Sequence, residues 1–240
     1  MEYIRNLGSV LVCYSGGTDS ALLLHLARKA LGESAQGIFF DSALIPRRDR
    51  DDALSLNPDV HIREVDIFSM PSLADNPEDR CYTCKYNILS LAKAEAGRLG
   101  LKHVLEGSHA DDVGQHRPGR RAVEELGVLS PFEAVGLGKA DIRRISQEEG
   151  LSTWDRPSYS CLITRLPHNE PVLAKNLQRI EALEAIMRQL GFREFRIRHR
   201  GEGAILETVP EEASLLTMHK GAIEEQFKNH GYTCIELRAR

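Results

Sequence analysis

Apolar and polar positions along the first two-thirds of the chain predict strands and helices in turn. Short apolar runs at residues 10–14, 37–40 and 103–107 are typical of buried strands, and residues 61–65 alternate like a short strand. Helical periodicity appears at residues 21–27, 47–56, 85–99 and 141–150. Such alternation predicts right-handed crossovers and a parallel sheet, so the expected fold is α/β and Rossmann-like.

The pattern changes after about residue 165. A long amphipathic helix is predicted at residues 172–190, followed by alternating runs at 195–199 and 204–207, a helix at 210–227 and a last strand at 232–237. Residues 69–79 are rich in Pro, Asn and Asp and predict a loop. We therefore expect two domains, a larger one at residues 1–165 and a small α+β domain at residues 166–240.

The connection between the first strand and the first helix has the composition of a phosphate-binding loop. It reads Ser15, Gly16, Gly17, Thr, Asp19, Ser20. The two glycines allow several backbone N–H groups to face one point, and the positive end of the following helix faces the same point. The serine hydroxyls add donors, and Asp19 can hold Mg²⁺ against phosphate oxygens. A plain turn would need neither the second glycine nor the flanking serines.

Further polar residues follow the other predicted strands. Ser42 comes after the second strand, and Gly107 ends the strand near residue 105. Ligands of parallel sheets gather at the carboxyl ends of the strands, so this edge is the expected site. Arginines at positions 117, 120 and 121 suit a nucleotide phosphate, although a solvated charged surface explains the last two nearly as well. Arg196 and Arg198 share one strand face and are candidates for binding a substrate phosphate, or are surface charges.

The five cysteines fall into two groups. Cys13 and Cys234 lie in apolar strand patterns and are expected to pack in the core. Cys81, Cys84 and Cys161 have polar or proline-flanked neighbours. Three thiolates without a fourth protein ligand suit a [4Fe–4S] cluster, whereas a structural zinc would need a fourth ligand such as His109 or His116. A buried Cys81–Cys84 pair beside an unrelated nucleophile at Cys161 is the remaining alternative.

Cations beside these cysteines favour the thiolate form. Arg80 and Lys85 flank the Cys-x-x-Cys pair, and Arg165 follows Cys161. A nearby positive charge is expected to lower the pKa of a thiol.

Composition limits the classes of partner and compartment. The chain has 240 residues, 42% of them hydrophobic, and a formal net charge of −4. This balance gives no overall attraction to nucleic acid, and no apolar run is long enough to span a bilayer. The odd number of cysteines argues against a disulfide framework, and residues 1–5 show no signal-peptide core. We expect a cytoplasmic protein with no membrane partner.

The motif at residues 15–20 resembles the SGGxDS loop of the PP-loop ATP pyrophosphatases, in which the loop grips the pyrophosphate of ATP. Among these, the chain resembles the LarE family of ATP-dependent sulfur transferases, which act in the synthesis of the nickel-pincer nucleotide. It departs from the family pattern at His109 and Gln115, where Asn and Asp are common, and at residues 204–207. The matching stretches are residues 14–23, 41–42, 79–85, 107–112, 117–119, 130–131 and 154–165, together with Val172.

The resemblance implies that ATP, with Mg²⁺ at Asp19, adenylates a carboxylate of a pyridinium biscarboxylate mononucleotide, and that sulfur then replaces AMP. Some members sacrifice the sulfur of a cysteine at the position of Cys161. Others hold a [4Fe–4S] cluster with three cysteines, and the present pattern favours this type, with Cys81, Cys84 and Cys161 as ligands and sulfide as a sulfur source. A homo-oligomer is expected. The implied nucleotide and substrate residues are Ser15, Gly16, Gly17, Asp19, Ser20, Ser42, Gly107, Asp112, Arg117, Arg165, Arg196 and Arg198.

Three other functions share part of this pattern. Ammonia-dependent amidating synthetases carry the same loop but have no use for the three polar cysteines. A tRNA thiolase would combine the loop with cluster cysteines, yet the acidic charge balance disfavours nucleic acid. A non-catalytic ATP-binding or metal-binding scaffold would not need Ser15, Asp19 and Ser20 intact.

Overall fold

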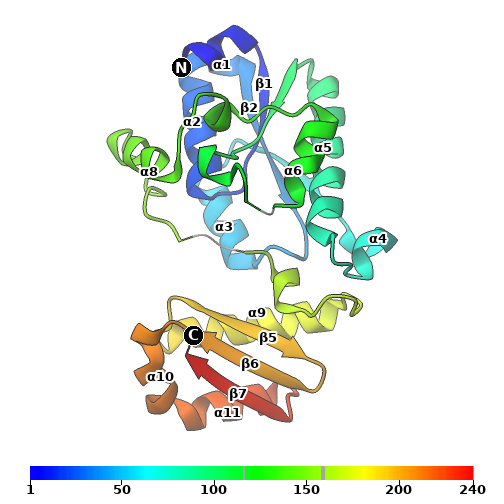
Figure 1. Ribbon diagram of the computed structural model, residues 1–240, viewed down its shortest axis with the longest axis vertical. Helices are drawn as coiled ribbons and strands as arrows, with labels where there is room; N and C mark the ends of the chain where they lie inside the picture. Colours follow the sequence, from blue (N-terminus) through cyan, green and yellow to red (C-terminus); the bar gives the residue numbers. More distant parts are fainter. Residues whose placement is uncertain (116, 158–159, 240) are drawn as a thin grey trace. The chain divides into compact units, whose positions relative to one another are not determined.

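The computed structural model describes residues 1–115, 117–157 and 160–239 (Figure 1). The chain divides into two compact units, which are described separately. The first consists of Met1–Asp66 and Asp79–Tyr159, and the second of Ile67–Glu78 and Ser160–Arg240. Cys161 and Arg165, which lie within the predicted first domain, therefore belong to the second unit. No helix in the described ranges is long and apolar enough to cross a membrane.

The first unit is built on a parallel sheet. Within the described residues its strands are β1 (Val10–Cys13), β2 (Ala35–Asp41), β3 (His61–Glu64) and β4 (His103–Leu105), in the order β3-β2-β1-β4. All three strand pairs are parallel, so the α/β, Rossmann-like prediction is confirmed. The carboxyl ends of β1, β2 and β4 share one edge, which is where the candidate phosphate loop begins.

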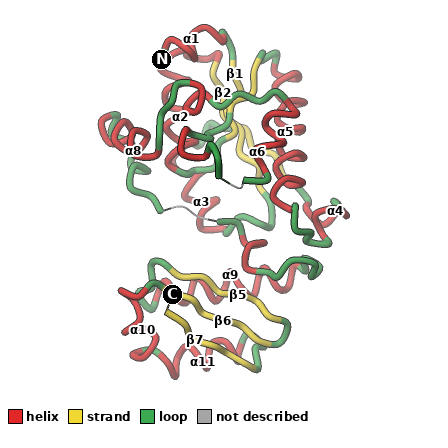
Figure 2. Tube along the Cα trace, viewed as in Figure 1, coloured by secondary structure: helices red, strands yellow, loops and turns green. Residues whose placement is uncertain are grey.

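Helices lie on both sides of this sheet (Figures 1 and 2). On one side α2 packs against α1 and α8, and on the other α5 packs against α6. These crossovers bury both faces of the sheet, which explains why its central strands are continuously apolar. The helices of this unit are α1 (Glu2–Leu7), α2 (Thr18–Leu31), α3 (Arg47–Leu56), α5 (Arg80–Leu99), α6 (Gly119–Leu126), α7 (Pro131–Ala134) and α8 (Lys139–Glu148).

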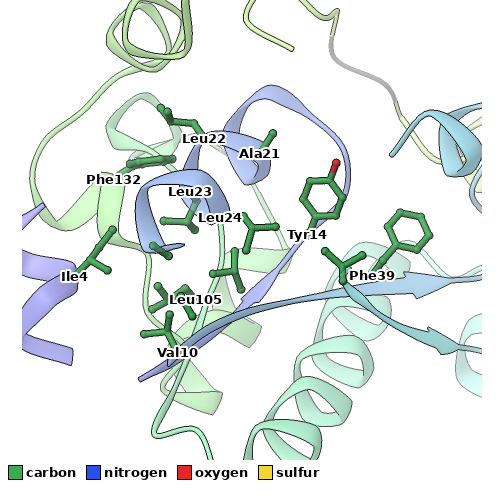
Figure 3. Packing of buried hydrophobic residues seen from close by; sticks show 14 of the residues in the cluster. Ile4, Val10, Tyr14, Ala21, Leu22, Leu23, Leu24, Phe39, Leu105 and Phe132 are labelled. Atoms are coloured by element: carbon green, nitrogen blue, oxygen red, sulfur yellow. The ribbon is translucent and has the colours of Figure 1, made fainter. Parts of the chain in front are cut away.

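The core of the first unit centres on consecutive leucines of α2 (Figure 3). Leu22, Leu23 and Leu24 are fully buried, and they belong to the same cluster as Phe39 of β2 and Leu105 of β4. Burying a leucine side chain stabilises a fold by about 1.5–3 kcal/mol. Because α2 starts at the candidate phosphate loop, this packing also fixes the position of that loop.

The second unit has a small mixed sheet. In the described part its strands are β5 (Phe195–Arg200), β6 (Gly203–Thr208) and β7 (Cys234–Ala239), with β5–β6 antiparallel and β6–β7 parallel. Helix α9 (Ala174–Gln189) packs against β5 and contacts α11 (Lys220–Asn229). The remaining helices are α4 (Pro71–Ala74) and α10 (Ala213–Met218). This smaller unit is α+β, as predicted.

Several element boundaries differ from the predictions. Helix α5 begins at Arg80 rather than 85, because Asp79 already accepts a hydrogen bond from the amide of Thr83 at 3.1 Å. The predicted loop at 69–79 contains the short helix α4. The predicted helix at 210–227 is interrupted at His219, whose ψ of 12° is not helical. The short helices α1, α6 and α7 were not predicted.

One cysteine prediction is wrong. Cys234 is exposed rather than packed in the core. It is the first residue of β7, a strand at the end of the sheet order, and its side chain lies on the face away from the buried residues Ala204 and Leu206 of β6. An alternating pattern alone does not tell which face of a two-sided strand is covered.

Candidate functional site

The loop at residues 15–20 holds its own shape through hydrogen bonds within the loop. The Ser15 amide donates to Ser20 Oγ at 3.1 Å, the two hydroxyl oxygens lie 3.0 Å apart, and Ser20 Oγ donates to the Gly17 carbonyl at 3.2 Å. Gly16 has a φ of +78°, and a Cβ there would lie 2.4 Å from Ala53 Cβ. Only glycine fits this position. These contacts within the loop and the close approach of Ala53 together define its shape.

The segment that follows α8 fastens this loop from outside. Arg156 Nη1 donates to the Gly16 carbonyl at 2.9 Å, while its Nη2 lies 3.1 Å from Asp52 Oδ2. Thr18 Oγ1 donates to the Thr153 carbonyl at 2.7 Å. Arg156 and Thr153 were not among the predicted site residues. Arg156 lies in the stretch at 154–165 that matches the LarE family, and Thr153 directly precedes it, so this match was the signal that could have found them.

A cavity of about 280 Å³ opens beside the loop at the carboxyl ends of β1 and β4. It brings together seven of the predicted nucleotide residues: Ser15, Gly17, Asp19, Ser20, Gly107, Asp112 and Arg117. Its other lining residues are Cys13, Lys85, Ile88, Leu89, Glu106 and Ser108. Hydroxyls, backbone amides and cations around one cavity suit a phosphorylated ligand.

Charges at the cavity are paired. Asp19 Oδ1 lies 2.5 Å from Lys139 Nζ, and Arg117 Nη2 lies 2.8 Å from Asp112 Oδ1. In the described ranges no three His, Cys, Asp or Glu side chains group as metal ligands. Asp19 nevertheless fits the predicted Mg²⁺ role, because its carboxylate already binds a cation at the mouth of the phosphate loop.

Glu106 is a site residue that the sequence reasoning missed. Its carboxylate follows β4, is buried, and accepts from Lys85 Nζ at 2.8 Å, from Ser108 Oγ at 2.9 Å and from the Ser130 hydroxyl. Burial alone would raise the pKa of Glu106, but the Lys85 ammonium and these hydrogen bonds hold it below its ordinary value. Glu106 is thus a fixed negative charge that orients Lys85 in the cavity.

Cys13 also lines the cavity but is a poor nucleophile. Burial raises the pKa of its thiol to about 12. The thiol is therefore protonated at neutral pH, although Cys13 is half-buried at the cavity wall rather than packed in the core as predicted.

Cys81 and Cys84 lie in the first turns of α5. Cys81 is exposed and Cys84 is half-buried. Residues separated by three, four or seven positions share a helix face, so both cysteines lie on the face that carries Lys85 and Ile88 into the cavity wall. The Cys-x-x-Cys pair and the phosphate loop are consequently joined through one helix.

Cys161 belongs to the second unit, immediately before the 3₁₀ helix Leu162–Arg165. Its carbonyl accepts from the amide of Thr164 at 3.0 Å and from Thr164 Oγ1 at 2.8 Å. Ser158 and Tyr159, in the same matching stretch, and His116, the alternative zinc ligand, lie outside the described residues. The convergence of Cys161 with Cys81 and Cys84 stays a prediction, since the three belong to different units.

Arginine side chains hold the Cys161 segment. Arg165 Nε lies 2.9 Å from Glu184 Oε1, and both side chains are almost fully buried, at 6% and 2% exposed. Arg165 Nη1 also donates to the Ser160 carbonyl at 2.8 Å. Arg198 donates to the Thr164 carbonyl and pairs with Glu207, both at 2.9 Å. The guanidinium of Arg165 therefore binds groups of its own segment and Glu184. Arg198, which lies on the same strand face as Arg196, uses part of its guanidinium to bind Glu207 and the Thr164 carbonyl.

The other predicted residues have local partners. Ser42 follows β2, and its hydroxyl accepts from the Leu44 amide at 3.3 Å. Arg120 pairs with Glu124 and Glu133, while Arg121 pairs with Glu125 and lies 3.5 Å above the Tyr82 ring. Both arginines fit the alternative of a charged surface.

No family model matches the chain. The uncharacterized protein slr1717 of Synechocystis sp. is 31% identical, with 98% of this chain and 90% of that protein covered. The pyridinium-3,5-bisthiocarboxylic acid mononucleotide synthase of Lactiplantibacillus plantarum is 27% identical over 98% of this chain and 87% of its own length. The chain belongs to the LarE family.

A further relative supports the assignment of this LarE-family protein to the PP-loop superfamily. A component of the glutamine-hydrolyzing GMP synthase of Methanoculleus marisnigri is 26% identical over 59% of this chain and 50% of that protein. The LarE family and these GMP synthases are PP-loop relatives.

Proposed function

We propose that this LarE-family protein is an ATP-dependent sulfur transferase that converts a substrate carboxylate into a thiocarboxylate. The observation that carries the proposal is the shared face of α5, where Cys81 and Cys84 adjoin the residues that line the phosphate cavity. The named synthase of Lactiplantibacillus plantarum supports a pyridinium biscarboxylate mononucleotide as the substrate, in nickel-pincer nucleotide synthesis.

The first step is activation of the carboxylate. A carboxylate oxygen attacks the α-phosphorus of ATP, and pyrophosphate leaves. The residues at 15–20 would bind the pyrophosphate through amides and hydroxyls, with Lys85 and Arg117 adding positive charge. Asp19 would hold Mg²⁺ in place of the Lys139 ammonium. The product is an acyl adenylate, in which AMP is the leaving group.

The second step is sulfur transfer. A sulfur nucleophile attacks the acyl carbon and AMP leaves, so one oxygen of the substrate is replaced by sulfur. Two thiols spaced by three residues at a helix N-terminus fit iron–sulfur ligation, and Cys161 would supply the third ligand. A bound [4Fe–4S] cluster would supply a fourth iron position for a sulfide. The paired charges of Arg165 and Glu184 would keep Cys161 in place.

Anaerobic reconstitution with iron and sulfide tests the cluster. The expected result is a brown protein with broad visible absorption that Cys81→Ser, Cys84→Ser and Cys161→Ser each abolish. The matched control is Cys234→Ser, because this exposed cysteine lies in β7 and should leave the absorption unchanged. A colourless protein whose Cys161 becomes dehydroalanine during turnover would establish the sacrificial mechanism instead.

A second assay separates sulfur transfer from amidation. With ATP and the carboxylate substrate, sulfide should support formation of a thiocarboxylate and AMP, whereas ammonia should give no amide. Amide formation would favour an ammonia-dependent synthetase, and sulfur incorporation into tRNA would favour a tRNA thiolase.

A further inference from the structure

The outer edge of the sheet in the second unit is open. In the sheet order β5-β6-β7, strand β7 pairs with β6 on one side, and no described strand pairs with its other side. The strand is six residues long and contains no proline. Its side chains at Cys234, Glu236 and Arg238 are exposed. Such an edge presents unpaired N–H and C=O groups that can accept another strand.

Charges alternate from strand to strand on the sheet face that is half-buried at β5 and β6 and exposed at β7. By register, Arg196 of β5 lies opposite Glu207 of β6, which lies opposite Arg238 of β7. Glu207 also pairs with Arg198 at 2.9 Å. At the edge, Arg238 Nη2 lies 2.6 Å from Glu236 Oε1, with the two side chains 50% and 52% exposed. The row of alternating charges thus ends at Arg238 of β7, and Glu236 lies two residues before it on the same strand.

This arrangement is self-complementary under a two-fold axis. We propose that β7 pairs antiparallel with β7 of a second copy of the chain, centred on Leu237. Glu236 then faces the partner subunit's Arg238, and Arg238 faces the partner subunit's Glu236. The charge row continues across the edge and the two sheets join. Registers centred on Glu236 or Arg238 would instead bring like charges together, so the charges favour the register centred on Leu237, which alone makes two opposite-charge pairs.

The contact is isologous, because each copy contributes the same surface. A single strand edge buries less than the roughly 1,200 Å² of a standard interface, so the dimer is weak and reversible. Dimerisation does not depend on the proposed sulfur chemistry, because β7 carries none of the cysteines assigned to it. Dimerisation does make one continuous sheet of the two copies, so that the sheet faces carrying Arg196 and Arg198 in each copy form a single surface.

Sedimentation velocity of the full chain over a wide concentration range tests the pairing. The wild type should show a monomer–dimer equilibrium, and Glu236→Arg or Arg238→Glu should each raise the dissociation constant by at least about tenfold, since each brings like charges together twice. The double variant Glu236→Arg/Arg238→Glu should restore dimerisation. The control reverses the exposed Arg144–Glu148 pair of α8, which should change nothing.

Mixing the two single variants gives the most specific test. One variant then carries two cations on β7 and the other two anions, so an equimolar mixture should form a heterodimer although neither variant self-associates. A wild type that stays monomeric, or single reversals that assemble like the wild type, would overturn the proposal. So would a mixture that does not associate while circular dichroism shows both variants to be folded.

Discussion

The phosphate loop at residues 15–20 and the Cys161 segment are both short connections, yet they are held in different ways. Ser15, Ser20 and Gly17 fix the first through hydrogen bonds among themselves. The second is fixed from outside by the buried pair of Arg165 with Glu184. The first loop should lose only part of its function when an outside contact, such as the Arg156 hydrogen bond, is removed, whereas the second should fail when either partner of its ion pair is lost.

Substitution at Gly16 is expected to have the largest effect. In Gly16→Ala the new Cβ meets Ala53 at 2.4 Å in a backbone conformation that disfavours side chains. Strain of a few kcal/mol at the loop should lower the rate of ATP-dependent adenylation by about 100-fold or more, as measured by pyrophosphate release.

Gly97→Ala is the control for Gly16. A Cβ at Gly97, which lies in α5 away from the cavity, would meet no atom within 4 Å. Its adenylation rate should stay within a few-fold of the wild type. Equal losses in the two variants would show that the shape of the loop is not what matters.

Breaking the ion pair tests the other half of the comparison. Arg165→Met leaves Glu184 buried without this partner and should cost about 3–5 kcal/mol of unfolding free energy, measured by denaturant titration. The double variant Arg165→Met/Glu184→Leu should recover much of that stability. Its sulfur-transfer activity should remain low, because the Cys161 segment has lost its anchor. Recovery of both properties together would contradict an anchoring role.

Arg156 joins the phosphate loop to the segment that leads towards Cys161. Arg156→Met removes the hydrogen bond to the Gly16 carbonyl, and a charged hydrogen bond contributes about 1.5–3 kcal/mol. The KM for ATP should rise about tenfold or more, with a smaller change in kcat. Arg144→Met, at an exposed pair on α8, is the control and should leave KM unchanged. A loss confined to kcat would argue against a role in shaping the loop.

The last prediction concerns Glu106 and the dependence of stability on pH. Because its folded pKa lies below the ordinary value of 4.5, its charge stabilises the fold above about pH 4.5, and this contribution is lost as the pH falls further. Glu106→Gln should therefore unfold more readily at neutral pH, by about 1–3 kcal/mol, and should lose less stability than the wild type on acidification. Chemical denaturation at pH 7 and pH 4 measures both. If the stability of the two proteins changed equally between pH 7 and pH 4, the Glu106 charge would not be a source of this pH dependence.

Local patterns made the fold and much of the cavity predictable from sequence. Strand, glycine turn and helix are encoded within one stretch, so Ser15, Gly17, Asp19 and Ser20 were expected at the sheet edge where the cavity lies. The carboxyl ends of parallel strands meet by topology, which also brought Gly107 to the same edge.

Contacts across long sequence separations were not predictable in this way. Arg156 and Gly16 are 140 residues apart, and no periodicity links them. Glu106 was not predicted, because a single carboxylate at the end of a strand does not indicate a site in the sequence. Its role is visible only once the fold places Lys85 beside it. The earlier start of α5 mattered most, because it puts Cys81 and Cys84 inside a helix rather than at a junction between loop and helix.

The central claim is that ATP drives replacement of a carboxylate oxygen by sulfur. Mass spectrometry of the product, with AMP and pyrophosphate measured in the same reaction, tests it most directly. One AMP and one pyrophosphate should form for each oxygen replaced by sulfur, and none should form when Asp19→Asn removes the carboxylate from the loop. Hydrolysis of ATP to ADP, or AMP formation without sulfur in the product, would contradict the claim.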